Sequence, residues 1–222
     1  MRWRHYWAPF CLVGLSSLVL PFQEAEACSC VPTHPQTHFC ESDFVAVVRV
    51  RKFFLINEYE IAYQVKVSRI FKATPKAELA LKRGLLLTPT LDAMCGVNLD
   101  LGDTYVVSGR TNGDKPTISI CGLTLRWSEV TSRQRKGFRQ LYRYGCVCEI
   151  LYTQWWRKGT VLESAGGKRC LWESAPGPQV CQENHGICTP GPGGCHWMPS
   201  VPYKNCIKEH RLQRGQQRSR DP

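Results

Sequence analysis

The chain has 222 residues, a formal net charge of +11, 43% hydrophobic residues and 13 cysteines. This length accommodates one domain of ordinary size and a smaller one. A charge of this sign suits polyanionic partners, either nucleic acid or extracellular glycosaminoglycans, and the export signal described next argues against nucleic acid.

Residues 1–27 have the three parts of a secretory signal peptide. Two arginines supply a basic start, residues 8–22 an apolar run, and residues 25–27 read Ala-Glu-Ala, which is a small-residue cleavage site. A membrane anchor is the alternative, but the apolar run is shorter than the roughly 20 residues that span a bilayer. We therefore expect a secreted chain without a transmembrane segment, located in the extracellular space or matrix and beginning at residue 28.

The cysteine count supports export. Removal of residues 1–27 takes Cys11 away and leaves 12 cysteines. An even number in an exported chain predicts a disulfide framework of up to six bridges. The alternatives, free catalytic thiols or a built-in zinc site, fit an oxidising compartment less well.

Residues 44–121 have the pattern of an all-β domain. The segment 60–71 alternates between apolar and polar residues, and Asn112-Gly113 is a strong hairpin signal. We expect strands over 44–50, 60–71, 85–88, 104–109 and 117–121. Five strands with turns between them favour a small closed sheet, with a five-stranded OB-type barrel as the leading candidate.

Residues 128–144 change to a helical period, with Ser128 as the expected N-cap. Three cations of this helix, Lys136, Arg139 and Arg143, fall at i, i+3 and i+7 and so share one side. They are candidate residues for binding a polyanion. The alternative is that they form an ordinary solvated face.

From Cys148 onward the chain is rich in glycine, proline, tryptophan and cysteine. This composition is typical of a small domain that needs bridges because it buries too little apolar surface. We expect an N-terminal domain over 28–147 and a disulfide-rich C-terminal domain over 148–206. The basic tail, 207–222, is expected to be disordered.

The sequence contains no HExxH, GxSxG, P-loop or GxGxxG motif. Its histidines lack metal-ligand spacing, and no pair of carboxylates falls in a recognisable acid–base context. We therefore expect no enzymatic activity and no cofactor of the chain's own.

The expected mature start, Cys28-Ser29-Cys30, offers a different chemistry. The α-amine and carbonyl oxygen of one residue can close a five-membered chelate around a metal, provided that the amine, with a free pKa of about 7.7–8.0, is neutral. A catalytic zinc site keeps one position open for water, which such a terminus could displace. Two bridged cysteines would make the terminus rigid before it meets a partner, and Ser29 would point outward between them. The alternative is that the pair only fastens the end of a strand.

The segment CSCVPTHPQTHFC, residues 28–40, resembles the mature amino terminus of the tissue inhibitors of metalloproteinases. Further resemblance covers most of the chain and lies in SDFVAVVRV after Cys40, MCGVNL at 94–99, SRQRKGFRQLYRYGCVC at 132–148 and CLW at 170–172. It implies a netrin-like OB-type barrel with a flanking helix. It also implies a secreted inhibitor that forms a one-to-one complex with zinc metalloendopeptidases, the matrix metalloproteinases, and blocks their active site.

The same resemblance implies a role for each residue of the amino terminus. Cys28 would ligate the zinc of the bound metalloproteinase through its amine and carbonyl, and Ser29 would face the primary specificity pocket. The remaining expected contacts in the substrate cleft and along its edge are Cys30, Val31, Pro32, Asp92, Ala93, Met94 and Cys95, with Glu41 at the periphery. The implied bridges are Cys28–Cys95, Cys30–Cys121 and Cys40–Cys146.

The C-terminal cysteines depart from the family's pattern, because residues 149–160 lack the two closely spaced cysteines that are usual there. We expect Cys170–Cys181, Cys148 with Cys188 or Cys195, and Cys206 with the remaining one. The rival interpretation of the whole chain is a netrin-like module that binds heparan sulfate or other matrix polyanions without inhibiting a protease.

Overall fold

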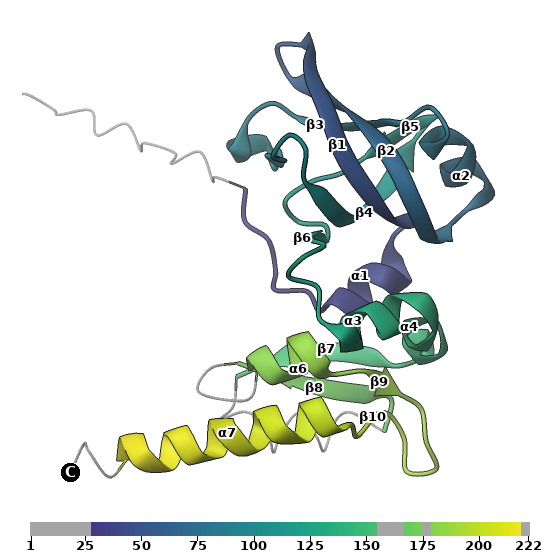
Figure 1. The fold of residues 1–222 in the computed structure, drawn as a ribbon. Coiled ribbons are helices and arrows are strands. Elements are labelled where there is room, and N and C mark those ends of the chain that lie inside the picture. The colour runs from purple at the N-terminus through teal and green to yellow at the C-terminus, as the bar shows by residue number, and fades with distance from the viewer. Residues whose placement is uncertain (1–27, 155–166, 175–178, 219–222) are drawn as a thin grey trace, which may run out of the picture.

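The computed structural model describes residues 28–154, 167–174 and 179–218, so the expected signal peptide lies outside the described residues. Figure 1 shows a β-sheet lobe followed by a smaller lobe of helices and short strands. The elements of the first lobe are α1 (Pro35–Glu41), β1 (Phe44–Asn57), β2 (Glu60–Ala73), α2 (Pro75–Leu81), β3 (Leu85–Pro89), η1 (Asp92–Met94), β4 (Thr104–Asn112), β5 (Lys115–Thr117), β6 (Thr124–Arg126), α3 (Ser132–Lys136), η2 (Gly137–Leu141), α4 (Tyr142–Tyr144) and η3 (Gly145–Val147). Those of the second lobe are β7 (Glu149–Thr153), β8 (Arg169–Glu173), α6 (Gln179–His185), β9 (Cys188–Thr189), β10 (His196–Trp197) and α7 (Val201–Arg218).

The sheet of the first lobe joins six strands in the order β1-β2-β3-β5-β4-β6, and β1 also pairs with β4. The pairings of β1, β2, β3, β5 and β4 therefore run in a ring, as in an OB-type barrel. The joint between β3 and β5 is a single parallel pair, Leu87 with Thr117. The fold is mainly β with an OB-like first domain, as the sequence predicts.

Strand β1 is buried on both faces over its first half because it lies between two cores. Alternate residues from Phe44 to Val50 belong to the core inside the sheet. Val45 belongs instead to a second core, which it forms with Phe138 and Tyr142. These two residues lie in the long helical segment, the name used here for the consecutive elements α3, η2 and α4 (132–144). The unbroken apolar run at the start of this strand thus has a partner on each side.

The strand expected at 117–121 ends at Thr117, so this prediction is wrong in its extent. Beyond Thr117 the backbone N–H of Ile118 donates to the carbonyl of Leu87 at 2.8 Å, and that of Ile120 donates to the carbonyl of Cys95 at 3.1 Å. The segment leaves the strand ladder because it is held against the loop that contains Cys95.

The short helices α1 and α2 are absent from the sequence predictions. Each has seven residues and begins with proline directly after a capping residue. The His34 ring nitrogen accepts from the backbone of Gln36, and the Thr74 hydroxyl accepts from the backbone of Ala77. Two turns of helix are too short for an apolar period to be visible, so the cap and the proline were the available signals.

The helix expected over 128–144 begins later, at Ser132. Thr131 is its N-cap: the Thr131 hydroxyl accepts from the Gln134 backbone at 3.1 Å, and the Gln134 side chain accepts from the Thr131 backbone at 2.9 Å. Ser128 is therefore not the cap. The helix widens into a π-turn over η2, where a side chain on Gly137 would overlap the ring of Tyr142.

The second lobe has short strands and a core made largely of disulfides. Strand β7 pairs in parallel with β8, and β9 pairs antiparallel with β10. Cys148, Cys170 and Cys188 form the buried cluster, with Trp197 packed against it. This arrangement is what a lobe with little apolar surface requires.

The three bridges of this lobe are Cys148–Cys195, Cys170–Cys188 and Cys181–Cys206. Cys148 thus takes one of its two expected partners, but the expected pair Cys170–Cys181 is wrong, and so is the expected partner of Cys206. Cys170 on β8 and Cys188 on β9 share one buried core. Cys181 lies on α6, which packs along α7 and so meets Cys206.

The part of the expected disordered tail that the structure describes, residues 207–218, is helical, because α7 extends through Arg218. Ser200 begins the helix by accepting the backbone N–H of Tyr203 with its hydroxyl and that of Lys204 with its carbonyl. The Cys181–Cys206 bridge then fixes the second turn. The inward face of the helix includes half-buried Tyr203, Cys206 and Ile207, and its other positions are mostly polar, so the sequence shows no strong apolar period.

Candidate functional site

The CxC segment is extended and tied to the sheet lobe at alternate positions. Cys28 is bridged to Cys95 and Cys30 to Cys121, each with its Cα atoms 5.2 Å apart. The two bridges lie side by side, with the sulfurs of Cys28 and Cys121 3.7 Å apart. All of these sulfurs are consumed in disulfides, so their closeness does not make a thiolate metal site. The bridges implied by the family resemblance, including Cys40–Cys146, are present.

Between and after the two anchors, the side chains face solvent. Ser29 and Pro32 are exposed, and Val31 retains 80% of its accessible surface. The hydroxyl of Thr33 donates to the carbonyl of Val31 at 2.9 Å and bends the segment toward α1. The segment therefore presents its side chains outward while its cysteines are held.

The loop that carries Cys95 contributes a second exposed stretch beside the first. Asp92, Ala93 and Met94 form the short helix η1, and all three are exposed. Because Cys95 is bridged to Cys28, these residues lie next to the chain start. We call Cys28–Pro32 together with Asp92–Cys95 the binding edge, after the protease contacts that the sequence predicts for these residues.

A strained turn sets the shape of this edge. Cys95 has φ of 66° and is the one non-glycine residue with a positive φ in the described part of the chain. A residue with a Cβ is strained in this region of backbone space, and such strain is found where surrounding structure imposes it. Here the Cys28 bridge and the hydrogen bond from Ile120 supply that constraint.

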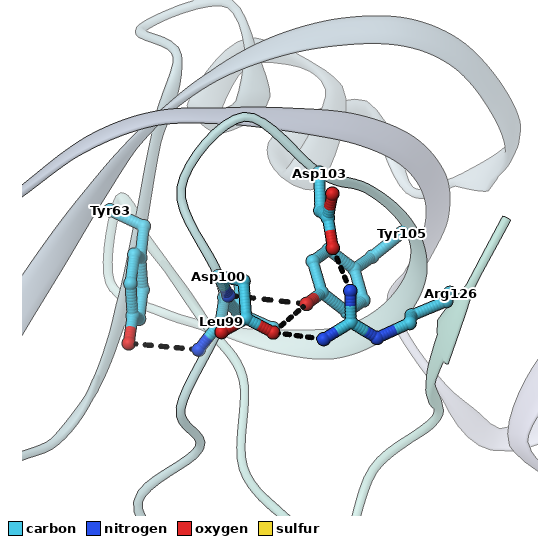
Figure 2. Close-up of polar contacts among 6 residues, drawn as sticks. All are labelled: Tyr63, Leu99, Asp100, Asp103, Tyr105 and Arg126. Carbon is cyan, nitrogen blue, oxygen red and sulfur yellow. Dashed lines mark hydrogen bonds and ion pairs between the residues drawn. The ribbon is translucent and has the colours of Figure 1, made fainter.

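The chain after Cys95 is held by the hydroxyl of Tyr63, which comes from β2. This hydroxyl donates to the carbonyl of Val97 at 3.2 Å and accepts the backbone N–H of Leu99 at 3.1 Å. On the other side, the hydroxyl of Thr88 accepts the N–H of Val97 at 3.0 Å. Figure 2 shows Tyr63 reaching the loop from the neighbouring strand.

The next turn of the loop is held by Tyr105 and Arg126 (Figure 2). The Tyr105 hydroxyl accepts the backbone N–H of Asp100 at 3.1 Å and donates to its carboxylate at 3.0 Å. Arg126 forms ion pairs with Asp100 and Asp103 and lies over the Tyr105 ring, 5.5 Å from its centre. Burial raises the pKa of Tyr105, which keeps its hydroxyl protonated as a donor.

These supporting residues were not found from the sequence. The partners of Tyr63 are 34 and 36 positions away, and Asp100 is 26 positions from its partner Arg126. Tyr63 belongs to the apolar positions of the alternating segment 60–71, but a polar role for its hydroxyl has no local signature. The acidic residues around Gly102 are a visible cluster, yet only the fold brings Arg126 to them.

Glu41 lies at the end of α1 and is exposed. It lines a groove of about 780 Å³ together with Thr33, Tyr59, Arg110 and Cys121. This groove begins where the CxC segment leaves the edge, so the structure places Glu41 beside the edge and outside it. The peripheral contact expected for this residue stays a prediction.

The candidate cations of the long helical segment are exposed. Lys136 ends α3, Arg139 lies in η2 and Arg143 in α4. Near Arg143, burial lowers the pKa of Lys72, and the charge of Arg143 acts in the same direction. The side of this helical segment that faces solvent is therefore positively charged.

In the part of the chain that the structure describes, we find no helix that is long and apolar enough to cross a membrane.

Comparison with known proteins gives independent evidence of the family to which the chain is similar. Residues 26–197 match the family described as tissue inhibitor of metalloproteinase. A tissue inhibitor of metalloproteinase from Drosophila melanogaster is 35% identical over 192 residues, which covers 82% of this chain and 87% of that protein. Metalloproteinase inhibitor 3 from Gallus gallus is 33% identical over 65% of this chain and 68% of its own length. Metalloproteinase inhibitor 2 from Homo sapiens is 31% identical over 62% of this chain and 66% of its own length.

Proposed function

Because the chain belongs to the tissue inhibitor of metalloproteinase family, we propose that it is a secreted protein that blocks zinc endopeptidases of the matrix metalloproteinase class. The group that blocks the enzyme is the amino terminus that forms at Cys28 when the signal peptide is removed. Members of this family are protease inhibitors and not enzymes.

In this mechanism Cys28 supplies two backbone atoms to the zinc of the partner protease. Its α-amine, once neutral, and its carbonyl oxygen occupy the position where the enzyme would hold its water. The protease zinc acts in catalysis by activating that water, so its displacement removes the nucleophile. The inhibitor itself needs no metal, and its own residues only position the donor atoms.

The observation that carries this proposal is the alternation of anchored and exposed residues along the CxC segment. Cys28 and Cys30 are bridged, while Ser29 and Val31 between and after them are exposed. The conformational entropy of this segment is lost when the chain folds, so its ordering does not reduce the affinity for a partner. The bridges therefore favour a direct role in recognition over the alternative of a simple strand fastening.

The rest of the binding edge fits an extended substrate cleft. Ser29 would enter the specificity pocket beside the metal, and Val31 and Pro32 would continue along the cleft. Asp92, Ala93 and Met94 would contact its rim, because the Cys28–Cys95 bridge sets them next to the chain start. Glu41 would touch the periphery.

One added residue tests the mechanism. A mature chain with a single alanine before Cys28 keeps every disulfide but moves the free amine away from the carbonyl of Cys28, so the five-membered chelate cannot form. We expect inhibition of a matrix metalloproteinase to weaken by at least about 100-fold, since a zinc-coordinating contact is lost. A chain with one alanine added after Pro222 serves as the matched control. Equal inhibition by the two extended chains would refute chelation by Cys28.

Binding to matrix polyanions is a second candidate function, and it can coexist with inhibition. The observation in its favour is the exposed set of Lys136, Arg139 and Arg143 on a chain of net charge +11. A netrin-like module that only bound polyanions would retain that binding and lack inhibition in the unextended chain as well. The alanine-extension experiment therefore also separates the two functions.

A further inference from the structure

Two residues that follow the binding edge are buried against the second lobe, although they precede the first strand of the sheet. His34 and Gln36 belong to the N-terminal segment, yet each is only 1% exposed and each contacts the second lobe. Figure 1 shows α1, which begins at this point, between the sheet lobe and the second lobe. The segment therefore joins the binding edge to the C-terminal domain.

Gln36 forms a reciprocal pair of hydrogen bonds with the backbone of Cys188. Its side-chain nitrogen donates to the Cys188 carbonyl at 2.7 Å, and its side-chain oxygen accepts the Cys188 N–H at 2.9 Å. Gly145 is packed so closely here that a Cβ on it would overlap both Gln36 and Cys188. A neutral amide is the side chain that both donates and accepts in this geometry.

His34 continues the contact toward α6. Its Nε2 donates to the carbonyl of Gln182 at 3.0 Å while its Nδ1 accepts the Gln36 N–H at 3.1 Å, which defines one neutral tautomer. The ring packs against Trp172 and Trp197, with ring centres 5.5 and 5.3 Å away. Burial lowers the pKa of His34 to about 4, so the ring stays neutral at extracellular pH.

The second lobe is itself rigid where it receives these residues. The side chain of Gln182 accepts the Glu173 N–H at 2.8 Å and donates to the Leu171 carbonyl at 3.1 Å, so α6 is fastened to β8. Cys188 is bridged to Cys170, which also lies on β8. The groups that hold His34 and Gln36 therefore belong to one cross-linked unit.

We propose that His34 and Gln36 form an interdomain latch through which the C-terminal domain positions the inhibitory segment. This inference rests on the proposed function, since it concerns the same binding edge. Cys28 and Cys30 fix the segment to the sheet lobe, and the latch fixes it again from His34 onward. The residues between Cys30 and His34 are thereby held at both ends, so their direction along a protease cleft is set before binding.

Without the latch, the next anchors after Cys30 would be Phe39, which is buried against the sheet lobe, and the Cys40–Cys146 bridge, so the segment between them would be less restricted. Val31 and Pro32 have little packing of their own, being exposed. Their ordering would then occur on binding, at a cost in affinity. His34 and Gln36 are in this sense positioning residues: they touch no protease, and they act through the residues that do.

The test uses the full chain with Gln36→Glu. At neutral pH the new carboxylate cannot donate to the Cys188 carbonyl and leaves it unsatisfied in a buried site. We expect inhibition of a matrix metalloproteinase to weaken by about tenfold relative to the native chain, with faster amide hydrogen exchange over residues 31–36. Gln64→Glu makes the same chemical change at an exposed position of β2 and should alter neither measurement.

The pH profile distinguishes a positioning role from general damage. In the Gln36→Glu chain the introduced carboxyl group regains a donor once it is protonated, so the ratio of variant to native inhibition constants should approach one as pH falls from about 7.5 to about 5.5. His34 and His38 do not titrate in this window, because burial lowers the pKa of each to about 4. On α6, burial raises the pKa of Glu183 and lowers that of His185, and both groups are common to the two proteins and cancel in the ratio.

Two results would overturn the latch. Faster exchange with unchanged inhibition would show that the contact only docks the lobes, and weaker inhibition with unchanged exchange would show that Gln36 acts in another way. Gln36→Asn, which keeps the amide but shortens its reach, replaces the glutamate variant if the latter does not form all six bridges. If the native chain inhibits no zinc endopeptidase, the proposed function fails, and the exchange comparison alone decides whether the latch orders the segment.

Discussion

At the scale of single residues, the binding edge depends on a turn that tolerates little change. Cys95 is held at a positive φ by its bridge to Cys28, and the chain continues through Gly96. A Cβ at Gly96 would overlap the carbonyl oxygen of Pro89 and press on that of Leu91. Both oxygens belong to the backbone, so neither can move aside as the tip of a flexible side chain would. The turn therefore fixes η1 relative to the chain start.

We predict that Gly96→Ala lowers the free energy of unfolding by about 2 kcal/mol, because the loop must shift to admit the methyl group. Inhibition should weaken as well, since Asp92–Met94 move with the loop. Urea denaturation and inhibition assays measure the two effects. Gly215→Ala is the control: nothing lies within 4 Å of a Cβ there. In a helix it should be neutral or stabilising by up to about 1 kcal/mol. A native denaturation midpoint for Gly96→Ala would contradict this account of the turn.

The buried ring of His34 predicts loss of stability in acid. Desolvation lowers its folded-state pKa to about 4, against 6.5 for the ordinary side chain. Between these pH values the unfolded chain binds a proton that the folded chain does not, so stability is fully present above pH 6.5 and falls as pH decreases toward 4. The shift corresponds to about 3 kcal/mol for His34. Burial also lowers the pKa of the partly buried His38 to about 4, so His38 contributes in the same direction and over the same pH range.

Denaturation at several pH values between about 7 and about 4.5 measures this dependence. His34→Gln should be less stable than the native chain at neutral pH but should show a shallower decline on acidification, because the titrating group is gone. His196→Gln removes an exposed histidine and should retain the native slope. Parallel curves for the native chain and His34→Gln would show that another group causes the acid sensitivity.

The sequence predicted that the two stretches of the edge lie together, but not which residues support them. Two cysteines one residue apart in an exported chain already indicate a fastened segment, and the family resemblance supplies their partners. The hydroxyl of Tyr63 acts on Val97, 34 positions away, and the guanidinium of Arg126 acts on Asp100, 26 positions away. Their identities fit many surface or core roles, so only the folded sheet reveals what they hold.

At the scale of elements, periodicity predicted those parts of the chain that bury an apolar face. Strands β1 to β4 and the long helical segment have such faces and were found, with errors at their ends. The helices α1 and α7 were not predicted, for two different reasons. Seven-residue α1 begins at a proline and is too short for a period. The polar α7 depends on Ser200 and the Cys206 bridge, which composition does not reveal.

The Cys181–Cys206 bridge gives a prediction at this scale. Replacing both cysteines with alanine removes a tie across 25 residues. By the chain-entropy estimate this tie is worth about 3 kcal/mol, and the face of α7 that includes Tyr203 and Ile207 is only half-buried, so its packing compensates little. We expect the helical circular dichroism signal to decrease and amide exchange over Val201–Arg218 to accelerate. Inhibition should be unchanged, because the binding edge is held by Cys28–Cys95 and Cys30–Cys121.

Retained helicity in this double variant would show that packing, and not the bridge, holds α7. Loss of inhibition would mean that α7 communicates with the binding edge through the second lobe. Alanine at both positions is preferable to a single replacement, because one free thiol could exchange with the other five bridges of the described chain.

At the scale of the whole molecule, the contact between the two lobes was not visible in the sequence. Composition separates the apolar, strand-rich segment from the cysteine-rich one, since only the former can build a core without bridges. The contact between His34 and Gln182 spans 148 positions, and a histidine before a proline has many uses. The pairing within the second lobe failed for a related reason: Cys181 is nearer to Cys170 in sequence, but the fold brings Cys188 to it.

Charge is also a property of the whole molecule, and it separates a specific polyanion site from general attraction. Changing Lys136, Arg139 and Arg143 to glutamate lowers the net charge by two per residue, from +11 to +5. The same change at Lys52, Lys66 and Lys76, which are exposed on the sheet lobe, gives an equal net charge with the helical cations intact. We expect the first triple variant to elute from heparin at clearly lower salt than the second, because close contacts release counterions whereas distant charges are screened beyond about 10 Å. Equal elution of the two variants would mean that heparin responds to net charge alone, and that the long helical segment is an ordinary solvated surface.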